Sequence, residues 1–327
     1  MEAAFGIIAI FGMVGNGLVL FVIYKVPNLQ KVTNILIGHQ SVADFMASFT
    51  LLFRYSAINI YLAPLVPHHR FLATLICKLW LGGFVFWSCL RVSTANLVFL
   101  TLERYVAVIH PQTYRLRASK RVVVTVCVAS WTLGILTVVY IPIVYNVLQS
   151  RDKVSCYARV HTVAGKFAIA FISFTSMIIV PLAIMLFSYI SIICKLRSAN
   201  RALLEDFETS AESVSLFSTR SVHLNAYGAT IYTSCPPTSE EQERRMTEQT
   251  AQRDVLKTMF LVCIVYLVCW IPNQVLYFHH QVIRSHDWSK AGHQFVILLA
   301  VTNVCINPLI YALKYRSFQI GLKQVFS

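Results

Sequence analysis

Charged side chains stand at a few positions inside long apolar runs of the sequence. Asp44, Arg91 and Arg104 lie within such runs, and Glu103 directly precedes Arg104. A carboxylate without a partner is costly in apolar surroundings, so we expect Asp44 to be protonated or bound to a cation. Arg104 can form a local ion pair with Glu103 and, when released, donate its fork of N–H groups to a partner's carbonyls. This is the chemistry of binding and switching. No catalytic constellation accompanies it, so we predict that the protein is not an enzyme.

Arg91 is the unusual member of this set, because it places a full charge among apolar residues. It lies two residues before Ser93, which turns it about 200° around a helix. We therefore expect Arg91 to point away from Asp44 and to lack an acidic partner. Two hypotheses stay open: Arg91 binds a carboxylate of a ligand, or backbone carbonyls satisfy its guanidinium.

The elements that must position these residues are membrane-spanning helices. The chain of 327 residues is 57% hydrophobic and only 13% charged, whereas soluble domains average about 25% charged residues. This composition excludes a soluble enzyme, a disordered chain and a nucleic-acid-binding domain. A helix needs about 20 mostly apolar residues to cross a bilayer, and a spanning backbone must satisfy its own hydrogen bonds. We predict an all-α membrane protein over residues 3–313, a bundle of seven transmembrane helices at about 3–24, 32–56, 76–110, 121–145, 162–196, 250–281 and 291–313.

The loops between the runs give the orientation. The net charge is +14, and most of the 28 Lys and Arg lie in loops on one side, which the positive-inside rule makes cytoplasmic. The N-terminus is then extracellular. Residues 198–249 are polar and rich in Ser, Thr and Glu, so we predict a flexible cytoplasmic loop, either a phosphorylated segment or a plain linker. Residues 315–326 form a short amphipathic helix. We also expect the chain to be shortened at both ends, because two residues precede the first run and no cysteine follows Tyr311.

Polar and helix-breaking residues recur in a fixed order through the seven runs, and intramembrane polar groups are functional candidates. The set comprises Gly15–Val19 around Asn16, Ser41–Asp44, Glu103–Tyr105, Trp131, Pro181, Cys269–Pro272 and Asn307–Tyr311. This ordered set resembles the class A (rhodopsin-like) G-protein-coupled receptors from the first run to the chain end. The stretch Cys-Trp-Ile-Pro-Asn-Gln at 269–274 is similar to neuropeptide receptors of the galanin, somatostatin and allatostatin kind.

The resemblance implies an activation switch. In the family, the arginine at the Arg104 position opens the cavity for the G protein. The tryptophan of the sixth span is a lever coupled to the ligand, the prolines are hinges, and two tyrosines swing inward. The residues at these positions are Glu103, Arg104, Tyr105, Tyr189, Trp270, Pro272, Asn307, Pro308 and Tyr311.

The resemblance also implies an ion site and a set of partners. Asp44, Ser93, Asn303 and Asn307 match the family's sodium-binding positions, so we expect an allosteric Na⁺ and no other cofactor. A hydrogen-bonded polar core without an ion is the alternative. The implied partners are an extracellular peptide, a heterotrimeric G protein, arrestin, receptor kinases and membrane lipids, at the plasma membrane. Nucleic acid is excluded.

Two of the nine cysteines stand apart from the rest. Most cysteines lie within spans, whereas Cys77 and Cys156 lie on the outer, oxidising side, so we predict that these two form a disulfide. Cys77 lies 27 residues before Arg104, about two more than the family usually shows. We therefore expect a bulge or an extra partial turn near the top of the third span, which moves pocket positions above Ser93 by a residue or two.

Two segments lack the residues that an amine ligand or a retinal ligand would require. Residues 81–88 contain no acid to anchor an amine, and residues 291–313 contain no lysine for a retinal Schiff base. The outer loops are basic, and the upper sixth span is polar and aromatic, which favours a peptide. The candidate ligand-binding residues are Phe86, Arg91, Asn273, Gln274 and Tyr277.

Two alternatives to a peptide receptor remain. One is a receptor for a lipid or small organic acid that is anchored by Arg91. The other is a seven-span transporter or channel, which would need a path lined by ionisable residues. The spans offer only Asp44 and Arg91 for such a path.

Overall fold

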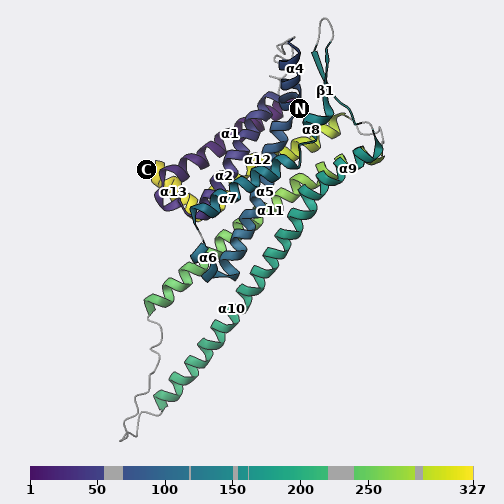
Figure 1. Cartoon of the computed structure of the whole chain (residues 1–327). Helices are drawn as coiled ribbons and strands as arrows, with labels where there is room; N and C mark the ends of the chain where they lie inside the picture. Colours follow the sequence, from purple (N-terminus) through teal and green to yellow (C-terminus); the bar gives the residue numbers. More distant parts are fainter. Residues whose placement is uncertain are drawn as a thin grey trace.

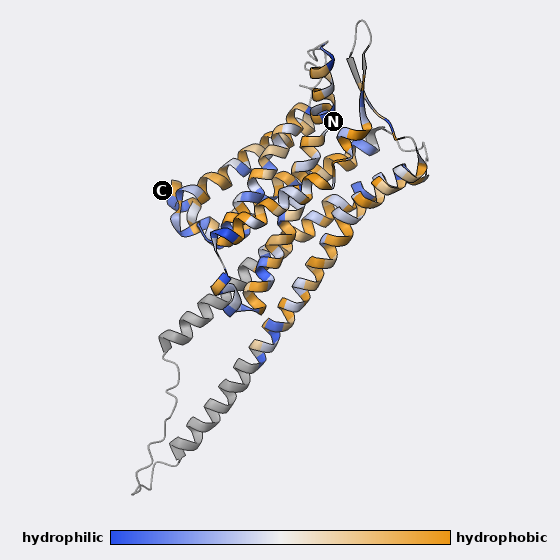
Figure 2. Ribbon diagram, in the orientation of Figure 1, coloured by the Kyte–Doolittle hydropathy of each residue, from blue (hydrophilic) through white to orange (hydrophobic). Residues whose placement is uncertain are grey.

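The computed structural model describes residues 1–54, 69–117, 119–149, 154–160, 162–219, 239–283 and 290–326. Within these ranges the fold is a helical bundle, with apolar residues along its length (Figures 1 and 2). The predicted bundle of seven spans is confirmed. The helices long and apolar enough to cross a membrane number 7: Glu2–Lys25, Val32–Arg54, Arg70–Ile109, Lys120–Val144, Val163–Ala199, Leu256–Val282 and Gly292–Lys314.

The elements follow the chain in a simple order. They are α1 (Glu2–Lys25), η1 (Pro27–Leu29), α2 (Val32–Arg54), α4 (Arg70–Ile76), η3 (Cys77–Leu81), α5 (Phe84–Ile109), α6 (Pro111–Arg117), α7 (Lys120–Leu136), α8 (Ile141–Val144), β1 (Tyr145–Gln149), β2 (Val154–Ala158), α9 (Val163–Phe174), η4 (Thr175–Ile179), α10 (Val180–Thr219), α11 (Ser239–Ile283), α12 (Lys290–Lys314) and α13 (Arg316–Phe326).

Side chains from α1, α2, α5, α11 and α12 form the core of the bundle. α2 packs against α1 and α5, while α12 packs against α1 and α11. Leu51, Leu90 and Trp270 are among the large side chains buried there. Large apolar side chains such as Phe11 on α1 and Val128 on α7 are exposed instead. An outer surface of this kind suits lipid, and it explains why the composition is more apolar than one core requires.

The two ends of the bundle differ in structure. One end carries the N-terminus and the antiparallel hairpin of β1 and β2, in which Val147 pairs with Cys156 (Figure 1). The predicted disulfide is confirmed: it joins Cys77 to Cys156, whose Cα atoms are 5.7 Å apart. We call this the hairpin end. The opposite end carries α6 and the C-terminal helix α13, and we call it the α13 end.

The third span is broken near the hairpin end, which confirms the predicted irregularity. A π-helical turn, η3, follows α4, and Gly83 then takes a φ of 81° before α5 begins. Arg54 of α2 donates Nη1 to the carbonyl oxygens of Trp80, at 3.2 Å, and Leu81. A Cβ at Gly83 would lie 2.7 Å from Cζ of Arg54. Both the left-handed backbone and this close approach therefore require glycine.

The fifth span contains a second π-helical turn, η4, which we did not predict. Pro181 has no N–H, so it cannot donate to the carbonyl of Met177, four residues earlier. The hydroxyl of Tyr266 on α11 donates to that carbonyl instead, at 2.5 Å. The buried carbonyl thus keeps a partner, and the contact ties the fifth span to the sixth.

The segment 198–249 departs from our prediction of a flexible loop. α10 continues to Thr219 and α11 begins at Ser239, so helix extends into the segment from both sides. Residues 198–219 contain no Gly or Pro to end a helix, and they include Ala, Leu and Glu, which favour one. Residues 220–238 lie outside the described residues. The amphipathic helix predicted at 315–326 is present as α13, with Phe318 buried.

Candidate functional site

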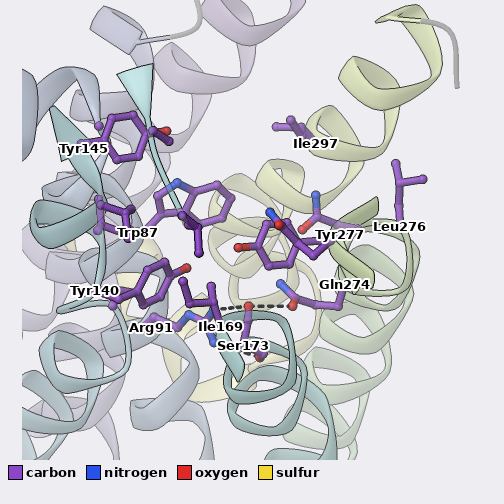
Figure 3. Close-up of a pocket in the computed structure, with 18 of the residues that line it drawn as sticks. Trp87, Arg91, Tyr140, Tyr145, Ile169, Ser173, Gln274, Leu276, Tyr277 and Ile297 are labelled. Carbon is purple, nitrogen blue, oxygen red and sulfur yellow. Dashed lines mark hydrogen bonds between the residues drawn. The ribbon is translucent and has the colours of Figure 1, made fainter. Parts of the chain in front are cut away.

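A cavity of about 270 Å³ opens at the hairpin end. Its walls come from α2, α5, α8, β1, β2, α9, α11 and α12, so most of the bundle contributes to it (Figure 3). Trp87, Tyr140 and Tyr277 supply aromatic surface, while Arg91, Ser173 and Gln274 supply polar groups. A cavity with apolar walls and a few convergent polar groups is the usual form of a ligand site.

Four of the five predicted ligand-binding residues line this cavity, namely Arg91, Asn273, Gln274 and Tyr277. Phe86 is not among the residues that line it. Its side chain is 2% exposed and belongs to the core, with its ring centroid 5.2 Å from that of Trp87. Trp87 lines the cavity in its place. The break at Gly83 sets where α5 starts, and a shift of one residue turns a helical side chain by about 100°.

Arg91 is held at the floor of the cavity by hydroxyl and carbonyl oxygens of the fifth span. Its Nη1 donates to the carbonyl of Ser173 at 3.2 Å and to Oγ of Ser176 at 2.7 Å, while Nη2 donates to Oγ of Ser173 at 2.7 Å. Ser173 in turn donates to Oε1 of Gln274 at 3.0 Å. This hydrogen-bond chain joins α5, α9 and α11. Only one of the three acceptors of Arg91 is a backbone carbonyl.

The charge of the cavity is one-sided. Arg54, Arg91 and His293 line it, and no Asp or Glu does so within the ranges that the structure describes. Arg91 is only 5% exposed, so water screens its charge poorly. An aliphatic amine would meet no carboxylate at the described walls, whereas an anionic group would meet Arg91.

The predicted sodium residues lie in a polar layer deeper in the bundle. Oδ2 of Asp44 accepts from Nδ2 of Asn307 at 3.0 Å and from Nε2 of Gln40 at 3.4 Å. Gln40 also donates to Oγ of Ser93. Buried oxygens of Asp44 (Oδ1), Asn303 (Oδ1) and Asn307 (Oδ1) have no hydrogen-bond partner among the described residues. Unpartnered carboxylate and amide oxygens fit a hard cation. Gln40 is a member of this layer that our sequence reasoning missed.

A compact ionic cluster lies at the α13 end. Arg104 donates Nε to Oε2 of Glu103 at 2.5 Å, and Nη2 to Oε1 at 2.5 Å. Nη2 also donates to Oγ1 of Thr33, which donates to Oε1 of Glu103 at 3.0 Å. Tyr114 of α6 donates its hydroxyl to the same Oε1 at 2.5 Å. We call these four residues, from three elements, the Arg104 cluster.

Tyr114 is a stable donor in this cluster. Burial, together with the charge of Glu103, raises the pKa of Tyr114 to about 12. Its hydroxyl therefore stays protonated at physiological pH and can keep donating to Glu103. Tyr105, which belongs to the predicted motif, points elsewhere: its ring centroid is 5.7 Å from that of Phe187 on α10.

The remaining switch candidates occupy the core between the two ends. Trp270 is 1% exposed, with its ring centroid 6.3 Å from that of Tyr266. The hydroxyl of Tyr189 lies 3.5 Å from Sγ of Cys263, which connects α10 to α11. Tyr311 is fully buried as well. Pro272 lies inside α11 and Pro308 lies inside α12, and each removes one backbone hydrogen bond.

Comparison with known proteins identifies the family of this architecture. The family model described as "7 transmembrane receptor (rhodopsin family)" matches residues 15–311. The chain belongs to this receptor family. The receptor is 23% identical to the RYamide receptor of Drosophila melanogaster over 97% of this chain and 61% of that protein. It is 23% identical to the allatostatin-A receptor of Bombyx mori over 98% of this chain and 78% of that protein.

A third relative is named for a different ligand. The octopamine receptor beta-2R of Chilo suppressalis is 21% identical over 98% of this receptor and 78% of its own length. The receptor thus spans about three fifths of the RYamide receptor and just over three quarters of the other two. These levels of identity are similar across relatives with different ligands in their names, so they do not choose a ligand.

Several site residues of the receptor had escaped the sequence reasoning. Ser173 could have been identified from the sequence, because it is a polar residue in an apolar run. Tyr140 lies near the end of the fourth span, and nothing in its sequence surroundings points to the cavity. Thr33 lies 70 residues from Glu103 in sequence and Tyr114 lies on the next helix, and both reach Glu103 through the packing of α2 and α6.

Proposed function

We propose that this receptor is activated by a peptide that inserts its tip into the cavity at the hairpin end. One observation carries the proposal: the cavity is polar and aromatic, and the described walls contain cations but no carboxylate. An amine ligand would lack its counter-charge there, although an octopamine receptor is among the relatives. A peptide offers the carbonyls, amides and carboxylates that such walls can bind.

The size of the cavity supports a peptide tip rather than a whole small ligand. Its volume of about 270 Å³ lies just below the roughly 300–1,000 Å³ of sites for drug-sized ligands. The rest of a peptide would rest on the hairpin and the adjoining loops. The names of the RYamide and allatostatin-A receptors are consistent with a peptide ligand.

The signal would leave the bundle at the α13 end, where the receptor activates a heterotrimeric G protein. Activation separates Arg104 from Glu103, so that its guanidinium can bind backbone carbonyls of the G protein. Trp270 and Pro272 on α11, together with Asn307, Pro308 and Tyr311 on α12, transmit the change from the cavity, and Tyr189 moves inward with them. The hinges at the two prolines make this repacking possible.

The same proposal fixes the orientation. The hairpin end is extracellular and the α13 end is cytoplasmic, with the receptor in the plasma membrane. This agrees with the excess of Lys and Arg near the α13 end. Arrestin, receptor kinases and membrane lipids are the further partners expected on the cytoplasmic side.

An allosteric Na⁺ is part of the proposal, with Asp44, Ser93, Asn303 and Asn307 as its ligands. The unpartnered oxygens of Asp44, Asn303 and Asn307 support it. Gln40 competes for Ser93, because its amide already donates to that hydroxyl. The test compares the Tm of the purified receptor in NaCl and in KCl at equal ionic strength. We expect a higher Tm in NaCl, and no difference in Asp44→Asn. Equal values for the unmodified receptor would reject the ion.

The function itself is tested by a peptide-library screen in cells that report several Gα classes. Each active peptide is then applied to Arg104→Gln, which we expect to bind it without signalling. Lys195→Gln, a change on α10 away from the Arg104 cluster, is the control and should signal normally. Silence toward every peptide in every reporter, at confirmed surface expression, would contradict the proposal.

A further inference from the structure

The cavity floor contains a cation whose charge no described neighbour balances. Arg91 borders the cavity and is 5% exposed. Its three hydrogen bonds all end on neutral oxygens of Ser173 and Ser176. Its Nε has no partner among the described residues. A buried cation held by neutral groups alone keeps most of its attraction for an anion, because little water screens it.

Two tyrosine hydroxyls border the cavity beside Arg91. Figure 3 shows the hydroxyls of Tyr140 and Tyr277 directed into the space beside Arg91. A guanidinium is a planar fork that matches the two oxygens of a carboxylate, and tyrosine hydroxyls can add further hydrogen bonds. No carboxylate of the receptor itself occupies this position in the described ranges.

We propose that the floor of the cavity binds a carboxylate of the ligand, with Arg91 as its counter-ion. This rests on the proposed function and deepens it: the activating peptide is acidic at its inserted tip. The carboxylate is either the free C-terminus or the side chain of an Asp or Glu near it. A peptide that ends in a carboxamide and has no acidic residue binds the same cavity far more weakly.

The hydrogen bonds of Arg91 also give the carboxylate a route to the sixth span. Arg91 donates to Ser173, and Ser173 donates to Gln274. Gln274 lies on α11 one helical turn from Trp270. A bound carboxylate draws the guanidinium toward the cavity and weakens the hydrogen bond from Arg91 to Ser173. The hydrogen bond that Ser173 donates to Gln274 then changes as well. Ser173 is therefore a positioning residue that acts through Arg91 and Gln274.

The first test uses the unmodified receptor and needs no substitution. A tetrapeptide library is prepared twice, once with free C-terminal carboxylates and once as carboxamides, with and without internal Asp or Glu. Small dicarboxylic acids and fatty acids form a separate arm. We expect peptides with at least one carboxylate to be roughly 30-fold more potent than their neutral counterparts, because charge-assisted hydrogen bonds are the strong ones.

The outcomes of this test are distinct. Equal potency of acids and carboxamides would overturn the carboxylate site and leave the peptide receptor intact. A response to fatty or dicarboxylic acids alone would support the carboxylate site and contradict the peptide ligand. No response in any arm, at confirmed surface expression, would overturn both.

The second test assigns the effect to Arg91. Arg91→Gln should reduce the ratio of acid to carboxamide potency from roughly 30-fold to about 1. Arg91→Lys keeps the charge and should retain about a third of the roughly 30-fold ratio. Lys166→Gln removes a cation from α9 outside the cavity lining and should leave the ratio unchanged. Because the ratio is measured within each variant, lower expression does not imitate the effect. A ratio that persists in Arg91→Gln would reject Arg91 as the counter-ion.

Ser173→Ala provides a readout that distinguishes positioning from binding. We expect the ratio of acid to carboxamide potency to stay within about threefold of the unmodified receptor, since Arg91 keeps its charge. The maximal response should fall, because the link to Gln274 is gone. Loss of the ratio with an unchanged maximum would contradict the relay.

Discussion

Arg91 and Arg104 lie on the same helix, α5, and their surroundings are opposite. Arg104 is bound by both oxygens of the adjacent Glu103, at 2.5 Å each. Among the described residues, Arg91 is bound only by neutral oxygens, two from hydroxyls and one from a carbonyl. The cluster at the α13 end is balanced in charge and needs no further group. The described walls of the cavity at the hairpin end contain no carboxylate, so the cavity can accept an anion.

The difference shows how one helix serves two tasks. An arginine that is ion-paired with an adjacent carboxylate can bind another group only when that ion pair is broken. An arginine with neutral neighbours is fixed in place but remains electrostatically unsatisfied. Substitutions at one end of the bundle therefore test whether the other end responds.

The largest effect is expected from removing the disulfide at the hairpin end. The double substitution Cys77→Ser and Cys156→Ser opens a link between residues 79 apart in sequence, which lowers stability by about 3 kcal/mol. We expect agonist binding to be lost, while basal signalling, which depends on the Arg104 cluster, is kept. Radioligand or fluorescent-peptide binding and the Tm in detergent measure this. Cys194→Ser, at an exposed free cysteine of α10, is the control, and preserved agonist binding in the double variant would contradict the prediction.

The next effect concerns the charge pair at the α13 end. Glu103→Gln leaves Arg104 without its acid, and breaking a buried pair costs roughly 3–5 kcal/mol. Because the side chains are 15% and 9% exposed, we expect about 2 kcal/mol, which corresponds to roughly a 30-fold shift toward the active state. Basal G-protein activation should rise, with ligand affinity at the cavity nearly unchanged. Glu2→Gln is the matched control at the N-terminus. Unchanged basal activity would show that Glu103 does not restrain Arg104.

A smaller effect is expected where the third span is broken. Gly83→Ala places a Cβ 2.7 Å from Cζ of Arg54, at a φ of 81°, which costs about 1–2 kcal/mol for a left-handed residue. We expect weaker peptide binding and a lower Tm, without a change in basal signalling. Gly17→Ala, whose Cβ would meet only the Phe45 ring at 3.8 Å, should be neutral. Equal behaviour of the two variants would refute the requirement for glycine.

The smallest effect tests the donor of α6. Tyr114→Phe removes one hydrogen bond to Glu103, worth about 1 kcal/mol, so basal signalling should rise roughly fivefold. Because burial and the charge of Glu103 raise the pKa of Tyr114 to about 12, the contribution of the hydroxyl is lost only as the pH rises toward that value. The ratio of variant to unmodified basal activity should therefore be constant from about pH 6 to 8. Tyr157→Phe, on the exposed hairpin, is the control, and a ratio that varies in this pH range would exclude this role of the hydroxyl.

Local sequence determined the spans and the irregularity of the third one. Apolar runs of membrane-spanning length are visible without any partner. The spacing from Cys77 to Arg104, compared with that of the family the sequence resembles, predicted the bulge that η3 and Gly83 supply. The pairing of Cys77 with Cys156 was also predicted correctly. Composition failed at 198–219, because this polar stretch has no Gly or Pro and can continue a helix that a span has already begun.

The tertiary structure alone decided which side chains meet. Thr33 and Tyr114 complete the Arg104 cluster, and Ser173 and Ser176 hold Arg91. Thr33, Ser173 and Ser176 lie 71, 82 and 85 residues from their arginines, and Tyr114 lies on the separate helix α6. Whether Phe86 or Trp87 faces the cavity depends on the rotation of α5, which the break at Gly83 sets. One residue turns a helix by about 100°, so apolar periodicity is sufficient to place a helix in the membrane and too coarse to orient its side chains. The sequence by itself thus determined a seven-helix receptor with two arginines in its third span. Packing between helices decided the surroundings of both: Arg104 is held in a cluster with Glu103, whereas the described walls of the cavity beside Arg91 contain no carboxylate.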